Sequence, residues 1–556
     1  MYADRIVRAA RIENFDAAPD PGTGSRPASN PASNPDLDSA LAIKDGRILA
    51  VGGAELLDRH RGTETDVVEF PGATLTPGLT DAHAHPVWGS MEIGGGLDLG
   101  GLDTLERICA RVADRIAASP PGAWITGYDL DVNAFDGEPD GEVFQRRFPG
   151  VPVSLMTRDA HALVISPAAV ELAGLSGAET FDDASEVVVG ADGRPTGYVV
   201  ELQAMRLVFD HYPHVPLPTA AGHVTTQLRA LAAGGLTGLH AMDFTDPSEA
   251  VYREIERTGD LPLRIRCSPL VPADSRRDTW ESVAALQGLA GRRWHVEGVK
   301  FMLDGTADNG SAWFEHPDSL GQNRRPLWKD VDGYRTAVRY FTERGIPTAT
   351  HAIGDRAVRF ALDAIEEAGS AGRAPHRIEH VESIPDDLLG RFAELGVVAS
   401  LQPVHATRMT RADQSDNWSR RIGPERVAHG WRTRDLIDRG AAVALGSDWP
   451  IGVGDPRVAL ADAQLRRPVE QPDARPVQPD QRIDAREAYA AMTRVTAAAA
   501  GAADRLGRIA PGYTADLTVF AANPLDLTPE QQAANRVLAT FIDGRVLRHD
   551  TQETAQ

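Results

Sequence analysis

Two histidines separated by a single residue stand out in this chain of 556 residues, in the segment Asp81-Ala82-His83-Ala84-His85. The apolar, β-prone residues before them predict a strand that ends where the histidines begin. Side chains two positions apart on a strand point to the same face, so the two imidazoles could bind one divalent metal ion. A pair of exposed or capping histidines at a strand end would show the same pattern. The metal interpretation therefore depends on the rest of the chain.

Four further runs of strand-like sequence carry a residue that could join such a site. Each run is short and rich in apolar or β-branched residues. A metal bound at the C-terminal ends of strands is typical of barrel enzymes. The runs and their residues are 296–304 with Lys300, 346–354 with His351, 376–382 with His380, and 441–449 with Asp448.

Helical patterns alternate with these runs, and strands that alternate with helices predict a parallel sheet. Together with three more candidate strands, the runs make eight strands, the number that a closed (β/α)8 barrel requires. The fold class that we predict is therefore α/β, a TIM barrel. The helical segments are 356–367, 385–395 and 435–439, and the additional strands are 237–244, 263–271 and 397–403.

The motifs at these strand ends resemble those of the amidohydrolase superfamily of metal-dependent hydrolases. Within it, the chain is similar to the YtcJ-like branch, amidohydrolase family 3, which includes N-substituted formamide deformylases. The resemblance covers nearly the whole chain and is far more specific for the superfamily than for a substrate. The matching segments are GLTDAHAH at 78–85, GVKFMLDG at 298–305, HAIGDR at 351–356, RIEH at 377–380, GSDWP at 446–450 and GRIAPGYTADL at 507–517.

The resemblance implies a binuclear metal centre. His83 and His85 would bind one metal ion, and His351 and His380 would bind a second. A carbamate formed from Lys300 and CO₂ would bridge the two. Because imidazole suits several metals, the ligands do not name the ion. We expect two zinc ions per chain, while iron, manganese, nickel or cobalt would also fit.

Lys300 and Asp448 each have a second interpretation. Without carboxylation, the Lys300 ammonium would pair with Asp304 or Glu297 at the strand end, although a neighbouring divalent charge inverts ordinary pKa expectations. Asp448 would contact the first metal, accept a proton as metal-activated hydroxide attacks, and pass it to the leaving nitrogen as general base and then general acid. The same residue could also cap a helix that starts near Pro450.

The remaining segments surround a predicted barrel at 74–504. Residues 1–73 and 505–556 contain short strands, and we expect the two ends to pair into one small β-sandwich. Within the first of these, residues 16–38 are rich in Pro, Ser, Asn and Gly and predict an exposed, mobile loop. Residues 88–219 are too long for a βα loop. They resemble the small α/β insertion of the YtcJ-like branch, which would overhang the active site.

Several polar and aromatic residues are candidates for substrate contact. For each, an ordinary alternative exists: an exposed polar residue, a cap on a strand, or part of the barrel core. The candidates are Asp159, His161 and Glu201 in the insertion, and Trp88, Asp304, Gln402 and Trp449 near the strand ends.

Composition limits the class of protein. The net charge of −22 and the isoelectric point near 5.2 argue against nucleic acid or anionic membranes as partners. Two cysteines, Cys109 and Cys267, are too few for a disulfide framework. The N-terminus has no apolar signal segment and no run is long enough to span a membrane, so we expect a cytoplasmic protein. The β-sandwich would offer a surface for a homodimer.

These observations favour a metal-dependent amidohydrolase that cleaves a C–N bond in a small molecule, an N-substituted formamide or another N-acyl amine. The same fold in this superfamily also supports deaminases, ester hydrolases and non-hydrolytic lyases or isomerases. A deaminase would often use one metal, so a carboxylated Lys300 argues against it. A hypothesis of another class is a non-catalytic metal-binding barrel, which predicts missing ligands, whereas every expected position is filled.

Overall fold

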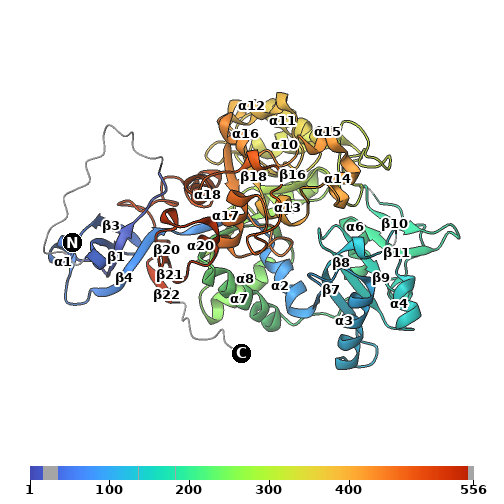
Figure 1. Cartoon of the computed structure of the whole chain (residues 1–556), viewed down its shortest axis with the longest axis horizontal. Coiled ribbons are helices and arrows are strands. Elements are labelled where there is room, and N and C mark those ends of the chain that lie inside the picture. Colours follow the sequence, from blue (N-terminus) through green and yellow to red (C-terminus); the bar gives the residue numbers. More distant parts are fainter. Residues whose placement is uncertain (17–34, 136, 182, 549–556) are drawn as a thin grey trace.

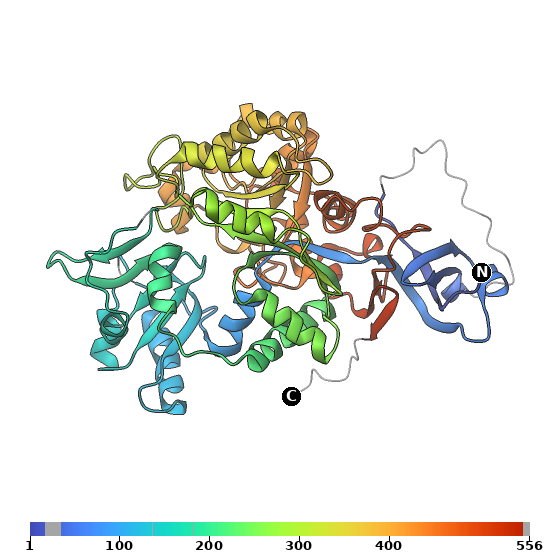
Figure 2. The ribbon, with the colours of Figure 1, turned by 180° about the vertical axis from the view of Figure 1, so that it is seen from behind.

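The computed structural model describes residues 1–16, 35–135, 137–181 and 183–548. Three parts follow one another along its longest axis: a sheet built from both chain ends, a central barrel, and an inserted unit at the far end (Figure 1). Figure 2 shows the same order from behind. Most of the predicted loop at 16–38 falls on residues 17–34, outside the described residues, and Pro35–Leu37 form a short 3-10 helix, η1.

The central part is a closed barrel of parallel strands, as predicted. Each strand pairs in parallel with the next, and a bridge between Ala84 and Trp449 joins the last strand region to the first. In order around the barrel, the eight strands found in the described residues are β5 (Leu79–Ala84), β12 (Leu236–Phe244), β13 (Arg264–Val271), β15 (Val299–Met302), β16 (Thr348–Ala352), β17 (Arg377–His380), β18 (Val398–Leu401) and β19 (Ala442–Leu445).

The barrel strands are buried on both faces. Every residue of β16, β17 and β18 is buried. Strands covered by helices outside and by packed side chains inside appear in the sequence as continuous apolar runs without alternation. The run predicted at 296–304 is divided into β14 (Trp294–Val296) and β15, because Gly298 adopts a φ of +88° that interrupts the extended chain.

Helices cover the outside of the barrel. In α11, the buried residues Ala357, Val358, Ala361 and Leu362 recur at helical spacing and face the strands. Among the described residues, no helix has both the length and the apolar character needed to cross a membrane. The helices outside the inserted unit are α1 (Glu55–His60), α2 (Pro86–Gly95), α7 (Leu217–Ala233), α8 (Ser248–Thr258), α9 (Arg277–Ala285), α10 (Val331–Thr342), α11 (Asp355–Ala368), α12 (Asp386–Leu395), α13 (Pro403–Arg408), α14 (Asn417–Ile422), α15 (Pro424–Val427), α16 (Thr433–Asp438), α17 (Pro456–Leu465), η3 (Pro479–Gln481), α18 (Ala485–Ala491), α19 (Arg494–Ala499), η4 (Pro524–Asp526) and α20 (Pro529–Ala533).

The two chain ends form one sheet, in the order β22-β21-β20-β4-β1-β2-β3. The long strand β4 pairs with β1 along most of its length and with β20 at its C-terminal end; Gly72, at a φ of +75°, lies where the pairing with β1 shifts register. The rings of Phe70 and Phe541, from the two halves, are 6.2 Å apart in one apolar cluster. The strands of both chain ends are thus joined in one hydrogen-bonded sheet with a shared apolar cluster, where we expected a small β-sandwich. Its strands are β1 (Arg5–Ile12), β2 (Ser39–Lys44), β3 (Arg47–Gly52), β4 (Asp66–Pro77), β20 (Leu517–Phe520), β21 (Val537–Ile542) and β22 (Arg545–Arg548).

The inserted unit is a six-stranded sheet with an apolar cluster on each face. Leu155 and Val164 pack in one cluster, whereas their neighbours Met156 and Leu163 pack in the other. This alternation follows from the two-residue period of a strand. The unit contains β6 (Leu97–Asp98), α3 (Leu105–Ala118), β7 (Ile125–Leu130), η2 (Val132–Ala134), α4 (Glu142–Arg147), β8 (Val153–Thr157), β9 (Ala162–Ile165), α5 (Pro167–Leu172), β10 (Glu186–Val189), β11 (Pro195–Val200) and α6 (Leu202–Phe209).

Candidate metal centre

Four histidines and one aspartate converge at the C-terminal end of the barrel. The ring centroids form a row, with 5.3 Å from His85 to His83, 4.8 Å from His83 to His380, and 4.4 Å from His380 to His351. The Asp448 carboxylate lies against this row, 3.4 Å from His83 Nε2, 3.0 Å from His85 Nε2 and 3.9 Å from His380 Nδ1. The structure therefore brings together the residues that the separate motifs predicted.

The expected ligand atoms suit a metal ion. Buried polar atoms normally have hydrogen-bond partners. His83 Nε2 and His380 Nδ1 are buried and make no hydrogen bond with any residue that the structure describes. A ligand atom from each of these residues and one from Asp448 lie within 4.8 Å of one another. Because imidazole nitrogen and carboxylate oxygen both bind divalent transition metals, the donor set fits such an ion.

The protonation states also favour metal binding. Burial, followed by the positive charge of Lys300, lowers the pKa of His83 to about 4. The same two causes, in the same order, hold the pKa of His351 well below its usual value. Burial would raise the pKa of Asp448, but the adjacent histidines, His83 foremost, hold it well below its ordinary value. Neutral imidazoles and an ionised carboxylate are the forms that bind a metal.

A buried carboxylate inside the barrel orients His83. Glu379 Oε2 is 2.6 Å from His83 Nδ1, and Arg377 donates to Glu379 at 2.5 and 3.0 Å. Arg377 also donates to the Ala82 carbonyl at 2.5 Å, which ties β17 to β5. The arginine keeps Glu379 ionised, so Nδ1 donates and Nε2 remains for a metal. Both residues lie in the motif RIEH at 377–380 without a predicted role, although the spacing Arg-x-Glu places them on one face of the strand.

Lys300 lies among the histidines. It is 2% exposed, and its charge lowers the pKa of His83, His351 and His380. Burial lowers the pKa of Lys300 itself to about 8. Within the described part of the chain, its ammonium group makes no hydrogen bond or ion pair.

The two proposed partners of Lys300 are engaged elsewhere. Glu297 pairs with Arg266 and His295. Asp304 is fully buried and accepts backbone N–H groups through both oxygens: Oδ1 from Ile353, Oδ2 from Gly354 and Trp313. Asp304 therefore holds two loops at the rim of the barrel. Its contact with a substrate stays a prediction.

The predicted capping role of Asp448 is wrong. The next helix in the described chain, α17, begins at Pro456, and Asp455 accepts its N-terminal hydrogen bond from the Arg457 amide at 3.0 Å. Asp448 instead has a φ of +58°, and its backbone N–H donates to the His83 carbonyl at 2.8 Å. Non-glycine residues seldom hold such a backbone conformation, and they do so most often at functional sites.

The inserted unit adds a histidine–glutamate pair. His161 lies in the turn between β8 and β9, with its ring 5.4 Å from that of His351. Its Nδ1 is 2.9 Å from Glu201 Oε2, and Glu201 is 2% exposed with a φ of +66°. Against the effect of burial, the Glu201 carboxylate raises the pKa of His161 to about 9. A Cβ on Gly305 would lie 2.0 Å from Glu201 Oε1, so the pair requires glycine there. Glu201 thus supports His161, and His161 faces the centre.

Asp159 fastens the same turn to the barrel. Its Oδ2 accepts hydrogen bonds from the Thr306 hydroxyl at 2.7 Å and from Asn309, and its Oδ1 accepts one from Thr157 at 2.6 Å. Tyr198, on β11, donates to Asn309 Oδ1 at 2.7 Å. The carboxylate is therefore engaged with protein groups, and Asp159 is an anchor between the inserted unit and the loop after β15.

The other predicted substrate contacts lie partly at the site and partly in the apolar core. Gln402 follows β18, and its Oε1 is buried without a hydrogen bond to the described part of the chain. The Trp88 ring is 5.8 Å from that of His85. Trp449 instead belongs to the main apolar cluster, where a Cβ on Gly454 would lie 2.6 Å from its ring. Gln402 and Trp88 are thus placed for a ligand, whereas Trp449 packs in the core.

His405, on α13, is a site residue that the sequence analysis missed. Its Nε2 is buried, has no hydrogen-bond partner among the described residues and lies 3.5 Å from Asp448 Oδ2. Its ring is parallel to that of His380, with an interplanar angle of 7° and 5.9 Å between centroids. Gln402 directly precedes this short helix, so the run Gln-Pro-Val-His after β18 could have indicated a further histidine at the barrel end.

Comparison with known proteins agrees with this geometry. The model of the Amidohydrolase family matches residues 66–548, so the chain belongs to this family. It is 28% identical to "Putative amidohydrolase YtcJ" of Bacillus subtilis, over 92% of this chain and 96% of that protein. It is 25% identical to "N-substituted formamide deformylase" of Arthrobacter pascens, over 92% and 95%.

Solved structures share the fold. A structure described as an uncharacterized metal-dependent hydrolase from Pyrococcus horikoshii superposes with a TM-score of 0.70 at 20% identity, over 94% of this chain and 99% of the other. The family resemblance and the barrel fold predicted from the motifs are therefore confirmed. Family and site together define a metal-dependent hydrolase.

Proposed function

We propose that this protein hydrolyses the C–N bond of a small N-acyl amine, with N-substituted formamides as the first substrates to test. The observation that carries the proposal is the Asp448 carboxylate, held within 4 Å of three of the predicted ligand imidazoles at the C-terminal end of the barrel. The similarity to a formamide deformylase along almost its whole length supports an amide-type substrate. A cytoplasmic location and a homodimer stay predictions.

The centre would hold two divalent metal ions, zinc being our first choice. His83, His85 and Asp448 would bind one, and His351 and His380 the other. A carbamate on Lys300 would link them: the neutral amine adds to CO₂ and releases a proton. Three features support this link, namely the pKa of about 8, the absence of a protein partner within the described residues, and the position of Lys300 near both histidine pairs.

The metal ions and the surrounding side chains would have separate roles in the reaction. Bound metal ions would polarise the substrate carbonyl and lower the pKa of water. Asp448, ionised at neutral pH, takes the proton of the attacking water on its carboxylate and delivers it to the leaving nitrogen. His161, fixed by Glu201, contacts the substrate from the side of His351. Gln402 Oε1 is free to accept a hydrogen bond from the substrate N–H.

Elemental analysis of protein grown with bicarbonate and mixed metals tests the centre, followed by a screen of formamides and other amides. We expect close to two metal ions per chain, with Lys300→Ala losing one or both. Close to one metal ion in the unaltered protein would contradict the bridged pair. It would favour a mononuclear site and redirect the search toward deaminase or non-hydrolytic chemistry, and metal binding without any turnover would favour a non-catalytic barrel.

The substrate role of His161 needs a separate experiment. His161→Ala should leave the metal content unchanged and alter KM or kcat. If the metal is lost instead, His161 of the inserted unit contributes to metal binding and not to substrate binding.

A further inference from the structure

Helix α13 carries a histidine that the proposed reaction leaves without a role. His405 is 5% exposed, and its Nε2 makes no hydrogen bond with any described residue. The helix itself is fixed, since the Thr407 hydroxyl and Arg408 Nε donate to buried Asp462 of α17 at 3.0 and 2.9 Å. Because buried polar atoms normally have partners, the group that Nε2 faces is the place to look for one.

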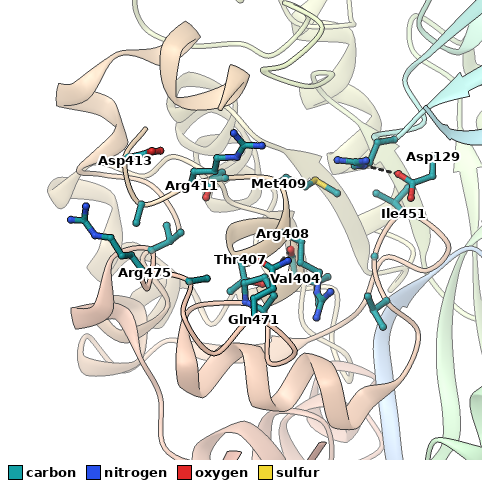
Figure 3. A pocket seen from close by; sticks show the side chains of 18 residues that line it. Asp129, Val404, Thr407, Arg408, Met409, Arg411, Asp413, Ile451, Gln471 and Arg475 are labelled. Carbon is teal, nitrogen blue, oxygen red and sulfur yellow. Dashed lines mark hydrogen bonds and ion pairs between the residues drawn. The ribbon is translucent and has the colours of Figure 1, made fainter. Parts of the chain in front are cut away.

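Two faces of α13 point in different directions. Val404, Thr407 and Arg408, spaced three and four residues apart, line a cavity of about 590 Å³ between the inserted unit and the barrel loops (Figure 3). His405 does not line this cavity, and its Nε2 lies 3.5 Å from Asp448 Oδ2. The helix therefore separates the cavity from the metal centre and presents His405 to the centre.

The two oxygens of Asp448 face different histidines. Oδ1 lies 3.4 Å from His83 Nε2 and 3.0 Å from His85 Nε2, the predicted ligands of the first metal ion. Oδ2 lies 3.5 Å from His405 Nε2 and 3.9 Å from His380 Nδ1. Oδ1 is therefore the oxygen placed for the first metal ion, and His405 is placed to act on Oδ2.

The far edge of the His405 ring faces a buried carboxylate. Glu382 is 6% exposed; its Oε1 lies 4.0 Å from His405 Nδ1, and its Oε2 accepts a hydrogen bond from Trp418 Nε1 at 2.7 Å. The ring also packs parallel to that of His380, with 5.9 Å between the centroids. These neighbours limit the rotation of the ring, so Nε2 stays directed at Asp448.

The chain adopts an uncommon conformation to place Glu382. His380 and Val381, directly before it, have φ values of +74° and +48°. Such values are rare for residues other than glycine, especially for a β-branched one, and they persist mainly at functional sites. The turn after β17 thus places His380 against the face of the His405 ring and Glu382 at its edge.

The direction of the contact with Asp448 follows from the groups involved. An ionised carboxylate only accepts hydrogen bonds, so the ring nitrogen that bonds to Asp448 must carry a proton. Carboxylates that bind a metal ion are themselves commonly hydrogen-bonded, and such partners strongly affect metal affinity. The separation of 3.5 Å exceeds an ordinary hydrogen bond by about 0.5 Å. Catalytic hydrogen bonds often tighten in this way when a site binds its ligands.

We propose that His405 is a positioning residue for Asp448. Its Nε2–H donates to Oδ2, the Glu382–Trp418 pair holds the ring, and Oδ1 is thereby kept on the side of the first metal site. The carboxylate then binds that metal ion through one oxygen and does not turn toward the second pair of histidines. This inference rests on the proposed function, since it assigns a support to the base of the same site.

Two substitutions separate the donated hydrogen bond from the packing of the ring. In His405→Gln, the amide nitrogen can occupy the place of Nε2 and still donate to Asp448. In His405→Asn, the shorter amide reaches only the place of Nδ1, so this hydrogen bond is lost. The matched control is His214→Asn, at an exposed histidine between α6 and α7. Zinc affinity is measured by competition with a chromophoric chelator, and the absorption spectrum of the cobalt-loaded protein reports the coordination of the ion.

We expect His405→Asn to lower zinc affinity by about tenfold and to change the cobalt spectrum, as for other residues that support a metal ligand. His405→Gln should keep the spectrum and stay within about threefold of the unaltered affinity. The control should match the unaltered protein. Equal losses in both His405 variants would mean that the ring acts by packing alone, and no loss in either would mean that it does not act on the centre. Both results would overturn the proposal.

An Asp448→Ala background tests whether His405 acts through Asp448. A positioning residue has nothing to position there, so adding His405→Asn should not lower zinc affinity further. A further loss of about tenfold would mean that His405 binds the metal directly or supports the fold, and would overturn the proposal.

A second variant covers the case in which His405→Asn does not fold. Trp418→Phe removes the hydrogen bond to Glu382 and keeps a buried aromatic ring, so it loosens the same support from its other end. A fall in zinc affinity of about threefold would support the proposal, and an unchanged affinity would overturn it.

The metal measurements also separate this inference from the proposed function. With N-butylformamide as substrate, His405→Asn should lower kcat by about tenfold and leave KM nearly unchanged. If no formamide is hydrolysed but the zinc and cobalt results are as expected, only the proposed function fails. If formamides are hydrolysed and neither metal measurement responds to His405→Asn, only this inference fails. An unaltered protein that binds neither zinc nor cobalt would overturn both.

Discussion

Polar groups inside the barrel form a saturated hydrogen-bond network, whereas some polar groups at its rim have no partner in the described chain. Inside, Arg377 and Glu379 are fully enclosed and joined by short hydrogen bonds, and Asp81 accepts the Ser447 hydroxyl at 2.5 Å. At the rim, Gln402 Oε1 has no hydrogen bond, and Arg411 has no ion pair within the described chain. A saturated network holds a fixed geometry, whereas groups without partners can bind something from outside.

We infer from this difference that the interior and the rim have separate roles. The interior orients the metal ligands, and changes there should alter metal affinity or the chemical step. Under the proposed function, the rim and the inserted unit would select the substrate, and changes there should alter KM while the metal content stays constant. Each prediction below tests that division, from the largest expected effect to the smallest.

The largest effect should come from Asp448→Asn, at the boundary between the two regions. The amide cannot accept the proton of the attacking water, so kcat should fall by about 10³-fold or more. Elemental analysis should show most of the metal retained, because the histidines remain. Turnover close to that of the unaltered enzyme would mean that another group is the base.

Within the interior, Glu379→Gln should weaken metal binding by about 10- to 100-fold, because the amide no longer fixes the ring of His83 with a charged acceptor. Competition with a chromophoric chelator measures this affinity. The control is Glu69→Gln, an exposed glutamate on β4 that pairs with Arg8. If both variants bind metal equally well, the network below His83 does not orient it.

At the rim, Asp159→Ala should loosen the turn that carries His161, since the four hydrogen bonds that the Asp159 carboxylate accepts are lost, one of them from the His161 backbone N–H. We expect KM to rise by about three- to tenfold, the effect of about 1 kcal/mol of lost positioning, with unchanged metal content. Asp192→Ala, in an exposed turn of the inserted unit, should have no such effect. Loss of metal in Asp159→Ala would show that the two regions are not independent.

The smallest effect concerns Glu92 on α2, between the centre and the inserted unit. Burial raises its pKa from 4.5 to about 7. The folded protein therefore binds a proton that the unfolded chain releases, and the free energy of unfolding falls as the pH rises from about 4.5 to about 7. Glu92→Gln should remove this loss, a gain of about 1–3 kcal/mol relative to the unaltered protein at about pH 8 and little at about pH 4. Urea unfolding at both pH values measures it. The control is Glu106→Gln, at an exposed residue of α3. If the free energy of unfolding changes equally with pH in both variants, burial of Glu92 does not have this effect.

Much of the fold follows from local pattern. The apolar runs and the helices between them predicted the barrel strands within a few residues, because strands covered on both faces need continuous apolar sequence. One exception has a local cause as well, since Gly298 divides a predicted strand.

The ligand histidines were predictable because each ends a strand, and parallel strands of a barrel end at the same face. The residues that contact these groups from distant segments were not predictable. Glu379 meets His83 across 296 residues of chain, and His405 reaches Asp448 from a separate helix. Asp304 has the residue type of a ligand contact, yet backbone amides from two loops occupy both of its oxygens. Residue type and spacing thus determined which groups stand at the barrel end. Only the tertiary structure decided which of them have partners, because hydrogen bonds between distant segments depend on how the strands close into the barrel.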